Sequence, residues 1–148
     1  MKKPIMALDV GSHRIGVAVS DDKRTMALPL RTVDARRRRS ALEEIIELIE
    51  DYDVAELVVG WPLDMTGAEG RAVDRVRDLV DDLEQALSRQ DIGPLPVHRW
   101  DERLSTTAAD RLLIDADMSR ARRKETVDQV AACKILEGFL AHCDGDRG

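Results

Sequence analysis

A chain of 148 residues with 43% apolar side chains is long enough for one domain with a sizeable core, and no apolar run approaches the ~20 residues of a membrane helix. The formal net charge of −6 argues against a surface coated in positive charge for nucleic acid, although residues 36–39 are four consecutive arginines. A second basic cluster lies at 120–124, and the total charge leaves open whether either cluster is a solvated surface or binds phosphate.

The first part of the chain predicts three short strands. Residues 5–10 form a nearly continuous apolar run, which is typical of a buried strand. Residues 15–20 follow after a turn at Gly11 and Ser12, so the two strands are expected to be antiparallel, because a parallel return needs a crossover of about a dozen residues. Residues 25–28 are a candidate third strand that Pro29 ends, which completes a three-stranded meander.

Helical periodicity alternates with strands in the rest of the chain. Ser40 followed by Glu43 is a capping-box signature for the start of the first helix. The further elements are a strand at 57–60, a helix at 73–87, a strand at 97–101, a helix from Thr107 to Leu113 and a helix with apolar residues from Val127 to Phe139. The pattern predicts an α/β domain over residues 1–140, with a mixed sheet whose later strands are parallel and with helices on both faces. Residues 141–148 are expected to be a flexible C-terminal tail.

Three acidic residues in unlike settings are candidates for a metal site. Asp9 lies at the end of the first strand, Glu102 follows the last strand, and Asp128 lies near the start of the final helix, beside its apolar stripe. Sites in such sheets form beyond the carboxyl ends of parallel strands, so these carboxylates could converge there. Oxygen ligands suit Mg²⁺ or Mn²⁺ rather than zinc, and two such ions can activate water and stabilise the departing oxygen of a phosphodiester.

Several neighbouring residues have two open interpretations. Arg14 and Arg103 could contact phosphate oxygens or could hold the acids in place as ion-pair partners. Asp128 could instead be a helix-start acid that the helix dipole favours. His13 lies in the turn after the first strand, near the predicted site, and Asp101 is expected to face away from Glu102 because strand side chains alternate.

Four segments of the chain resemble motifs of the YqgF (RuvX) family. They are Asp9-Val10-Gly11-Ser12-His13-Arg14-Ile15-Gly16-Val17-Ala18, Val58-Val59-Gly60-Trp61-Pro62-Leu63, Asp101-Glu102-Arg103-Leu104-Ser105-Thr106 and Val127-Asp128-Gln129-Val130-Ala131-Ala132. The resemblance spans nearly the whole chain, and four motifs in the right order make it specific.

The resemblance implies an RNase H-like fold in which acidic residues bind Mg²⁺ for phosphodiester cleavage. The family's acids correspond to Asp9, Glu102 and Asp128. Family members are described as nucleases that mature the 5′ end of the small-subunit ribosomal RNA precursor, and earlier as Holliday junction resolvases. Trp61 departs from the smaller aliphatic residue usual at its position, and it could stack on a base or pack against the neighbouring loop.

We therefore expect a Mg²⁺-dependent endonuclease that acts on structured RNA, with Arg14, Arg103, Arg122, Arg123 and Lys124 as candidate nucleic-acid contacts. A resolvase acting on branched DNA is the nearest alternative, and it would need a symmetric dimer. An ATPase of the actin and sugar-kinase type would need a second lobe for which 148 residues leave no room. A noncatalytic RNA-binding factor is disfavoured by the intact acids. The N-terminal sequence lacks a secretory signal pattern, so a cytoplasmic location is expected.

Overall fold

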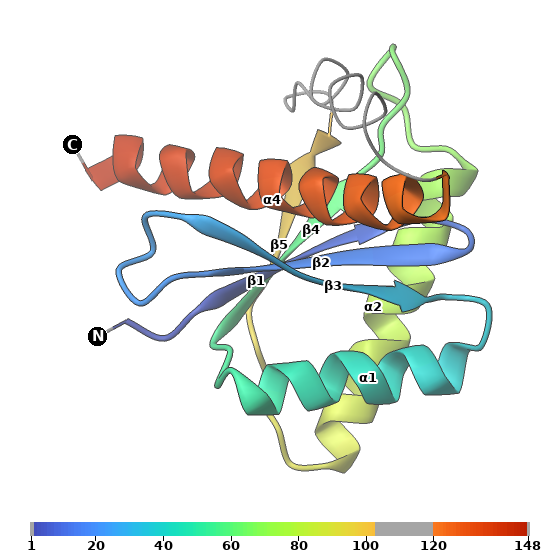
Figure 1. The fold of residues 1–148 in the computed structure, drawn as a ribbon, viewed down its shortest axis with the longest axis horizontal. Helices are drawn as coiled ribbons and strands as arrows, with labels where there is room; N and C mark the ends of the chain where they lie inside the picture. The colour runs from blue at the N-terminus through green and yellow to red at the C-terminus, as the bar shows by residue number, and fades with distance from the viewer. Residues whose placement is uncertain (1, 103–119, 148) are drawn as a thin grey trace.

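The computed structural model describes residues 2–102 and 120–147, with side chains described for 2–102 and 127–143. The described residues form a five-stranded sheet with three helices (Figure 1). The strands are β1 (Ile5–Val10), β2 (Arg14–Ser20), β3 (Ala27–Asp34), β4 (Glu56–Trp61) and β5 (Val97–Asp101). The helices are α1 (Arg38–Asp51), α2 (Arg71–Arg89) and α4 (Arg120–Arg147). The helix expected from Thr107 to Leu113 lies outside the described residues.

The sheet has the strand order β3-β2-β1-β4-β5 and mixes both kinds of pairing. β1, β2 and β3 are antiparallel neighbours, whereas β1 pairs with β4, and β4 with β5, in parallel. Each parallel return carries a helix, because a parallel connection needs a crossover: α1 precedes β4 and α2 precedes β5. The predicted meander followed by parallel strands is therefore confirmed.

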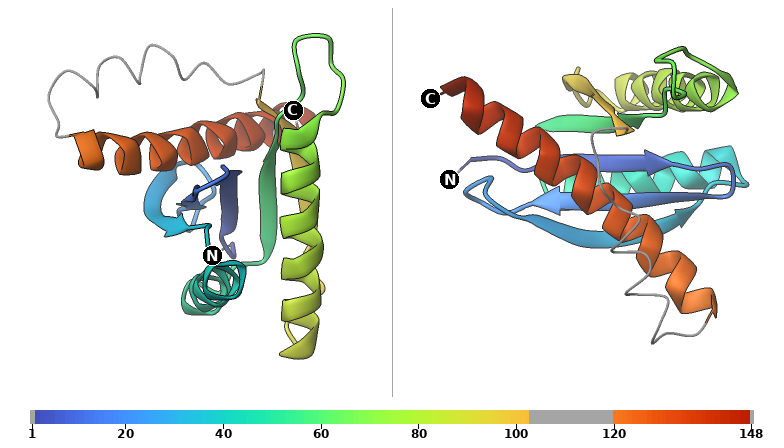
Figure 2. Two further views of the ribbon diagram at one scale, coloured as in Figure 1. Left: turned by 90° about the vertical axis from the view of Figure 1, so that its right-hand side faces the viewer. Right: turned by 90° about the horizontal axis from the view of Figure 1, so that it is seen from above.

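Helices cover both faces of the sheet, so the central strand is buried on each side. Met6 and Leu8 of β1 belong to a core with α1 and α2, whereas Ile5 and Ala7 belong to a second core with α4. Figure 2 shows α4 lying across one face and α1 beneath the other. Burial on both sides explains why β1 is a continuous apolar run rather than an alternating one.

β3 is longer than the sequence predicted, because Pro29 does not end it. The strand runs from Ala27 to Asp34, and its register with β2 shifts between Val17 and Ala18, where Pro29 is paired. β3 is an edge strand, so the missing N–H of proline costs no hydrogen bond to a further strand. A local reading of the sequence cannot distinguish a proline at an edge bulge from one that ends a strand.

Two helix boundaries also differ from the prediction. α1 begins at Arg38, before the expected Ser40, and its cap residue Arg37 makes no side-chain capping bond. α4 continues to Arg147, so residues 141–147 are helical although a flexible tail was expected; the division into a domain and a tail stays a prediction. His142 extends the helix packing through an edge contact with Trp100, at 6.0 Å between ring centroids. Neither α4 nor another helix of the described residues is long and apolar enough to cross a membrane, and the cytoplasmic location stays a prediction.

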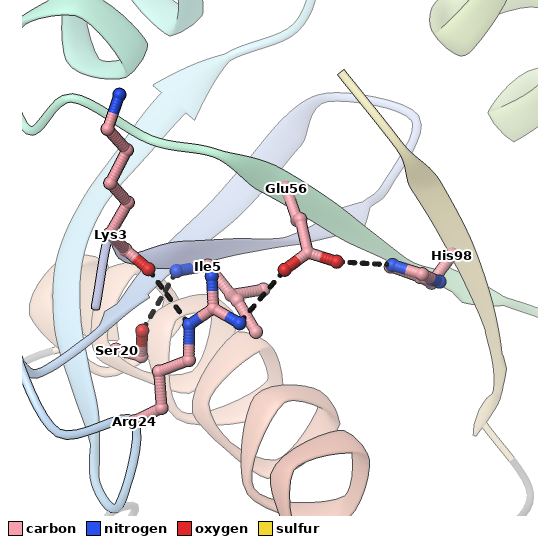
Figure 3. A network of polar contacts seen from close by, with 6 residues as sticks. All are labelled: Lys3, Ile5, Ser20, Arg24, Glu56 and His98. Atoms are coloured by element: carbon pink, nitrogen blue, oxygen red, sulfur yellow. Dashed lines mark hydrogen bonds and ion pairs between the residues drawn. The ribbon is translucent and has the colours of Figure 1, made fainter. Parts of the chain in front are cut away.

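A polar network joins four segments at the amino end of β4, opposite the predicted site (Figure 3). Glu56 forms an ion pair with Arg24, with 3.0 Å between Oε2 and Nη1, and its Oε1 lies 2.9 Å from Nε2 of His98. Beside it, the buried hydroxyl of Ser20 accepts the backbone N–H of Ile5 at 2.8 Å. Partial burial of Glu56 opposes its ionisation, but the hydrogen bond with His98 and the charge of Arg24 outweigh it and lower the pKa of Glu56 below its usual range.

Candidate metal and nucleic-acid site

The carboxyl ends of β1, β4 and β5 meet at one edge of the sheet, because these three strands are parallel. Asp9 is the last residue but one of β1, and Glu102 directly follows β5. Ile5 and Ala7 face α4, so the alternation along β1 places Asp9 on the same face. The same reasoning places Glu102 on this face, since Trp100 packs in the core with α4.

Gly60 on β4 leaves the space that the side chain of Glu102 occupies. The pairing of Leu8 with Val59 places Gly60 beside Asp9 on the neighbouring strand. A Cβ atom added to Gly60 would lie 3.0 Å from Cδ of Glu102 and would overlap its Oε1. It would also lie 2.7 Å from Cδ1 of Ile135, so the Glu102 carboxylate lies between β4 and α4.

Gly16 on β2 leaves the space that the backbone of Asp128 occupies. It is the direct register partner of Asp9 on the other side. A Cβ atom added to Gly16 would overlap the backbone carbonyl of Asp128 and lie 3.2 Å from its Cα, so α4 rests directly on this strand. Gly16, Asp9 and Gly60 thus form one row across three strands, and the other two acids approach this row from either side. We call this arrangement the acid row.

Arg14 pairs with Asp128 across 114 residues of sequence. Its Nε donates to Oδ2 of Asp128 at 2.6 Å, and the two side chains are 42% and 21% exposed. Arg14 thus forms an ion pair with Asp128, whereas the sequence had suggested the neighbouring Asp9 as the acid it would hold. A contact of Arg14 with phosphate stays a prediction.

The three carboxylates suit Mg²⁺ or Mn²⁺ chemically, since all their donors are hard oxygens. In the part of the chain whose side chains are described, no group of three or more His, Cys, Asp or Glu side chains is arranged as a set of metal ligands. Asp9 and Glu102 each make other polar interactions, and Asp128 is paired with Arg14. The backbone therefore brings the acids to one face around one row, and metal binding itself stays a prediction.

Trp61 packs inside the protein next to the site. It is 6% exposed, and its Nε1–H donates to Oε2 of Glu69 in the following loop at 2.9 Å. The guanidinium of Arg99 lies 4.2 Å from the ring centroid, and Arg77 holds Glu69 at 3.0 Å. Packing against the neighbouring loop is thus the role that the structure shows for Trp61.

The other candidate residues are only partly placed by the structure. His13 is exposed in the β1–β2 turn, with its Nδ1 2.9 Å from the hydroxyl of Ser12. Arg122, Arg123 and Lys124 lie in the first turns of α4, at the end that packs near β2, but their side chains are outside the described set. Arg103 lies outside the described residues, and Asp101 pairs with Trp61 at the end of β5.

The two glycines of the acid row were missed as site residues by the sequence analysis. A signal was present, because glycine within a strand often marks a close approach of another backbone or group. Both Gly16 and Gly60 lie inside strand segments next to aliphatic neighbours, where a larger residue would otherwise be expected.

A mixed sheet of this order, with helices on both faces and acids at the carboxyl edge, belongs to the RNase H-like class. Solved structures of the same fold include Thermus thermophilus RuvC in complex with a Holliday junction substrate (TM-score 0.57, 13% identity, covering 95% of this chain and 96% of that one). The structure of Thermus thermophilus RuvC alone gives a TM-score of 0.56 at 11% identity, over 96% of both chains. At such low identity the likeness shows the fold alone.

Residues 3–142 match the family described as "RuvX: Holliday junction resolvase", and the chain belongs to this family. Relatives named "Putative pre-16S rRNA nuclease" include proteins of Roseiflexus sp. (45% identical, 92% of each chain) and Moorella thermoacetica (46% identical, 92% of this chain and 93% of the relative). A protein of the same name from Halothermothrix orenii is 43% identical over 92% of this chain and 93% of its own. The resemblance inferred from the four motifs is confirmed.

Proposed function

We propose that this protein is a metal-dependent endonuclease that hydrolyses phosphodiester bonds in structured RNA, with the precursor of small-subunit ribosomal RNA as its substrate. The names of relatives that are 43–46% identical over almost the full chain support the substrate. The observation that carries the chemistry is the acid row, in which Gly16 and Gly60 admit Asp128 and Glu102 to either side of Asp9.

In this proposal Asp9, Glu102 and Asp128 hold Mg²⁺ or Mn²⁺ through carboxylate oxygens. When bound, such ions activate water and stabilise the charge on the departing oxygen of the phosphodiester. Arg14 balances the charge of Asp128 and fixes its side chain against β2. The backbone of α4 at Asp128 and the buried side chain of Ile135 lie against the inner side of the row, at Gly16 and Gly60.

The nucleic acid in this proposal is bound by basic residues around the same edge. The candidates are Arg14, Arg103, Arg122, Arg123 and Lys124. Guanidinium and ammonium groups there would contact phosphates on both sides of the bond that is cut.

The test is cleavage of a precursor RNA by Asp9→Asn compared with Asp22→Asn, in Mg²⁺ and with a chelator control. Asp22 is an exposed residue of the β2–β3 turn, at the opposite end of the sheet, so it is a matched loss of one negative charge. We expect Asp9→Asn to lose at least about 100-fold in cleavage rate, as for loss of a group that supports a metal directly, while its thermal unfolding stays cooperative. Full activity of Asp9→Asn, or cleavage that persists in chelator, would contradict the metal-site proposal.

The second candidate function is resolution of four-way DNA junctions, which the family description and the fold shared with RuvC favour. The same enzyme preparation is offered a precursor RNA and a mobile four-way DNA junction, with the oligomeric state measured by light scattering. Symmetric nicking of the junction by a dimer, without cleavage of the RNA, would replace the RNA proposal. A noncatalytic RNA-binding factor would instead bind RNA and cut neither substrate.

A further inference from the structure

The arginine tract at residues 36–39 lies at the same edge of the sheet as the acid row. β3 is antiparallel to β2, and Arg14 pairs with Asp34, so the end of β3 lies level with the β1–β2 turn. The backbone N–H of Ala35 donates to the carbonyl of His13 at 2.8 Å, which fixes the β3–α1 connection on this turn. In Figure 1 the β1–β2 turn, the end of β3 and the starts of α1 and α4 all lie at the right-hand side.

The register also gives the spacing between the tract and Asp9. Asp9 pairs with Gly16, and Gly16 pairs with Thr32 of β3. Two strand spacings place Thr32 about 10 Å from Asp9, and Arg36 lies four residues further along the chain, up to roughly 13 Å beyond Thr32. One nucleic-acid strand advances ~3.4 Å per nucleotide along a duplex, so a combined separation of at most roughly 16 Å corresponds to about five nucleotides.

Arg36 and Arg37 are the members of the tract with guanidinium groups available at this edge. Arg37 is exposed, and its charge helps to lower the pKa of the nearby Asp34 carboxyl. Arg36 forms a two-pronged pair with Asp34, in which Nη2 donates to Oδ2 at 2.7 Å and Nε donates to Oδ1 at 3.0 Å. Both side chains are more than half exposed, so the outer N–H groups of the guanidinium face solvent and can reach a phosphate. Arg38 instead points toward Asp82 of α2 at 3.7 Å, and Arg39 pairs with Glu43 along α1.

We propose that Arg36 and Arg37 bind the phosphate backbone of the nucleic-acid substrate within about five nucleotides of the bond that is cut, on the β3 side of the acid row. This inference rests on the proposed function for the identity of the ligand. Two exposed guanidinium groups on a fixed backbone suit a phosphate ladder, because each can form paired hydrogen bonds with phosphate oxygens. Arg36, Arg37 and the basic residues at the start of α4 place positive charge beside the acid row on the side of β2 and β3, although the whole chain has a net charge of −6.

The test measures binding of a fluorescein-labelled hairpin RNA that contains the precursor 5′ leader, in EDTA so that no cleavage occurs. Dissociation constants are determined from 50 to 200 mM salt for the wild type, Arg36→Gln/Arg37→Gln and Lys23→Gln/Arg89→Gln. Lys23→Gln/Arg89→Gln removes the same two positive charges from exposed residues at the end of the sheet opposite the acid row, in the β2–β3 turn and the last turn of α2. Arg36→Lys/Arg37→Lys keeps both charges and reports whether the backbone tolerates substitution.

Loss of two phosphate contacts should flatten the slope of log Kd against log salt by about 1.4 to 1.8. Over the fourfold salt range, the wild type should therefore lose roughly seven- to twelvefold more affinity than Arg36→Gln/Arg37→Gln. The opposite-end variant and the lysine variant should keep the wild-type slope.

Three results would overturn the inference. They are a wild-type slope in Arg36→Gln/Arg37→Gln, an equal flattening in Lys23→Gln/Arg89→Gln, and a flattening of the same size in Arg36→Lys/Arg37→Lys. The proposed function fails separately: a wild type that binds the hairpin with the expected slope but cuts no RNA in Mg²⁺ would remove the endonuclease and leave the phosphate contacts standing. Conversely, normal RNA cleavage with an unchanged slope in the tract variant removes only this inference.

Discussion

Substitution of Gly16 by alanine tests whether α4 rests on β2 as closely as the structure indicates. The added Cβ would overlap the carbonyl oxygen of Asp128 and lie 3.2 Å from its Cα. Both obstructing atoms belong to the backbone of a helix, so no side-chain rotation relieves the overlap. α4 must move away from β2, or β2 must bend within the sheet.

We expect Gly16→Ala to lower the free energy of unfolding by about 1–3 kcal/mol, the range for overpacking a filled core. For a chain of this length that corresponds to a fall in Tm of roughly 2–4 °C for each kcal/mol. The measurement is urea unfolding followed by circular dichroism, with a linear extrapolation to water. The same variant should lose cleavage activity, because the helix that moves carries Asp128.

Gly70→Ala is the matched control, since a Cβ there meets no atom within 4 Å. Gly70 caps α2 with an extended backbone, at φ −121°, which alanine adopts readily. We expect its free energy of unfolding to change by less than about 1 kcal/mol, because the weaker cap and the less flexible unfolded chain oppose each other. Equal stability of Gly16→Ala and Gly70→Ala would refute the close packing of α4 on β2.

Three further predictions follow from the described contacts. Gly60→Ala should reduce Mg²⁺-dependent cleavage at least tenfold while costing less stability than Gly16→Ala, because the obstructing Glu102 is a side chain that can move; unchanged activity would separate Glu102 from the reaction. Folding lowers the pKa of Glu56, so the ionised carboxylate stabilises the protein at pH values above the ordinary glutamate pKa, and this stabilisation is lost as the pH falls through the lowered pKa. The difference in free energy of unfolding between wild type and Glu56→Gln should therefore shrink from pH 6 to pH 3. A difference that stays constant would contradict the ion pairing. Burial, helped by the nearby charge of Glu137, raises the pKa of Cys133 to about 11, so iodoacetamide should label Cys143 first in the native protein, as read by mass spectrometry; faster labelling of Cys133 would contradict its burial.

The edge of the sheet that carries the acids could be predicted from local sequence. Asp9 ends an apolar run of strand length, Glu102 follows the strand segment at 97–101, and helices between later strands require parallel pairing. These two facts place both residues at carboxyl ends without any knowledge of the fold. Asp128 beside an apolar helical stripe then had to face the sheet, and α4 does pack there.

Local sequence could not predict structural features that depend on residues distant in the chain. Pro29 is accommodated because β3 is an edge strand, and the edge is defined only when all five strands are ordered. The ion-pair partner of Arg14 could not be read from local sequence, because Asp128 lies 114 positions away. α1 begins before the capping box at Ser40, after a β3–α1 connection that is held by the β1–β2 turn, through the Ala35 N–H to His13, and by Asp34, which accepts the backbone N–H of Arg36.

Glycine explains why the acids can meet in a sheet that is buried on both faces. A side chain at position 16 or 60 would fill the space between the sheet and α4, as Ala18 and Val58 do two residues away along the same strands. Removing those two side chains lets the backbone of Asp128 reach β2 and lets the Glu102 carboxylate lie over β4, with Asp9 between them. The polar site therefore forms within an apolar core where two strand residues lack side chains, and its position depends as much on Gly16 and Gly60 as on the carboxylates themselves.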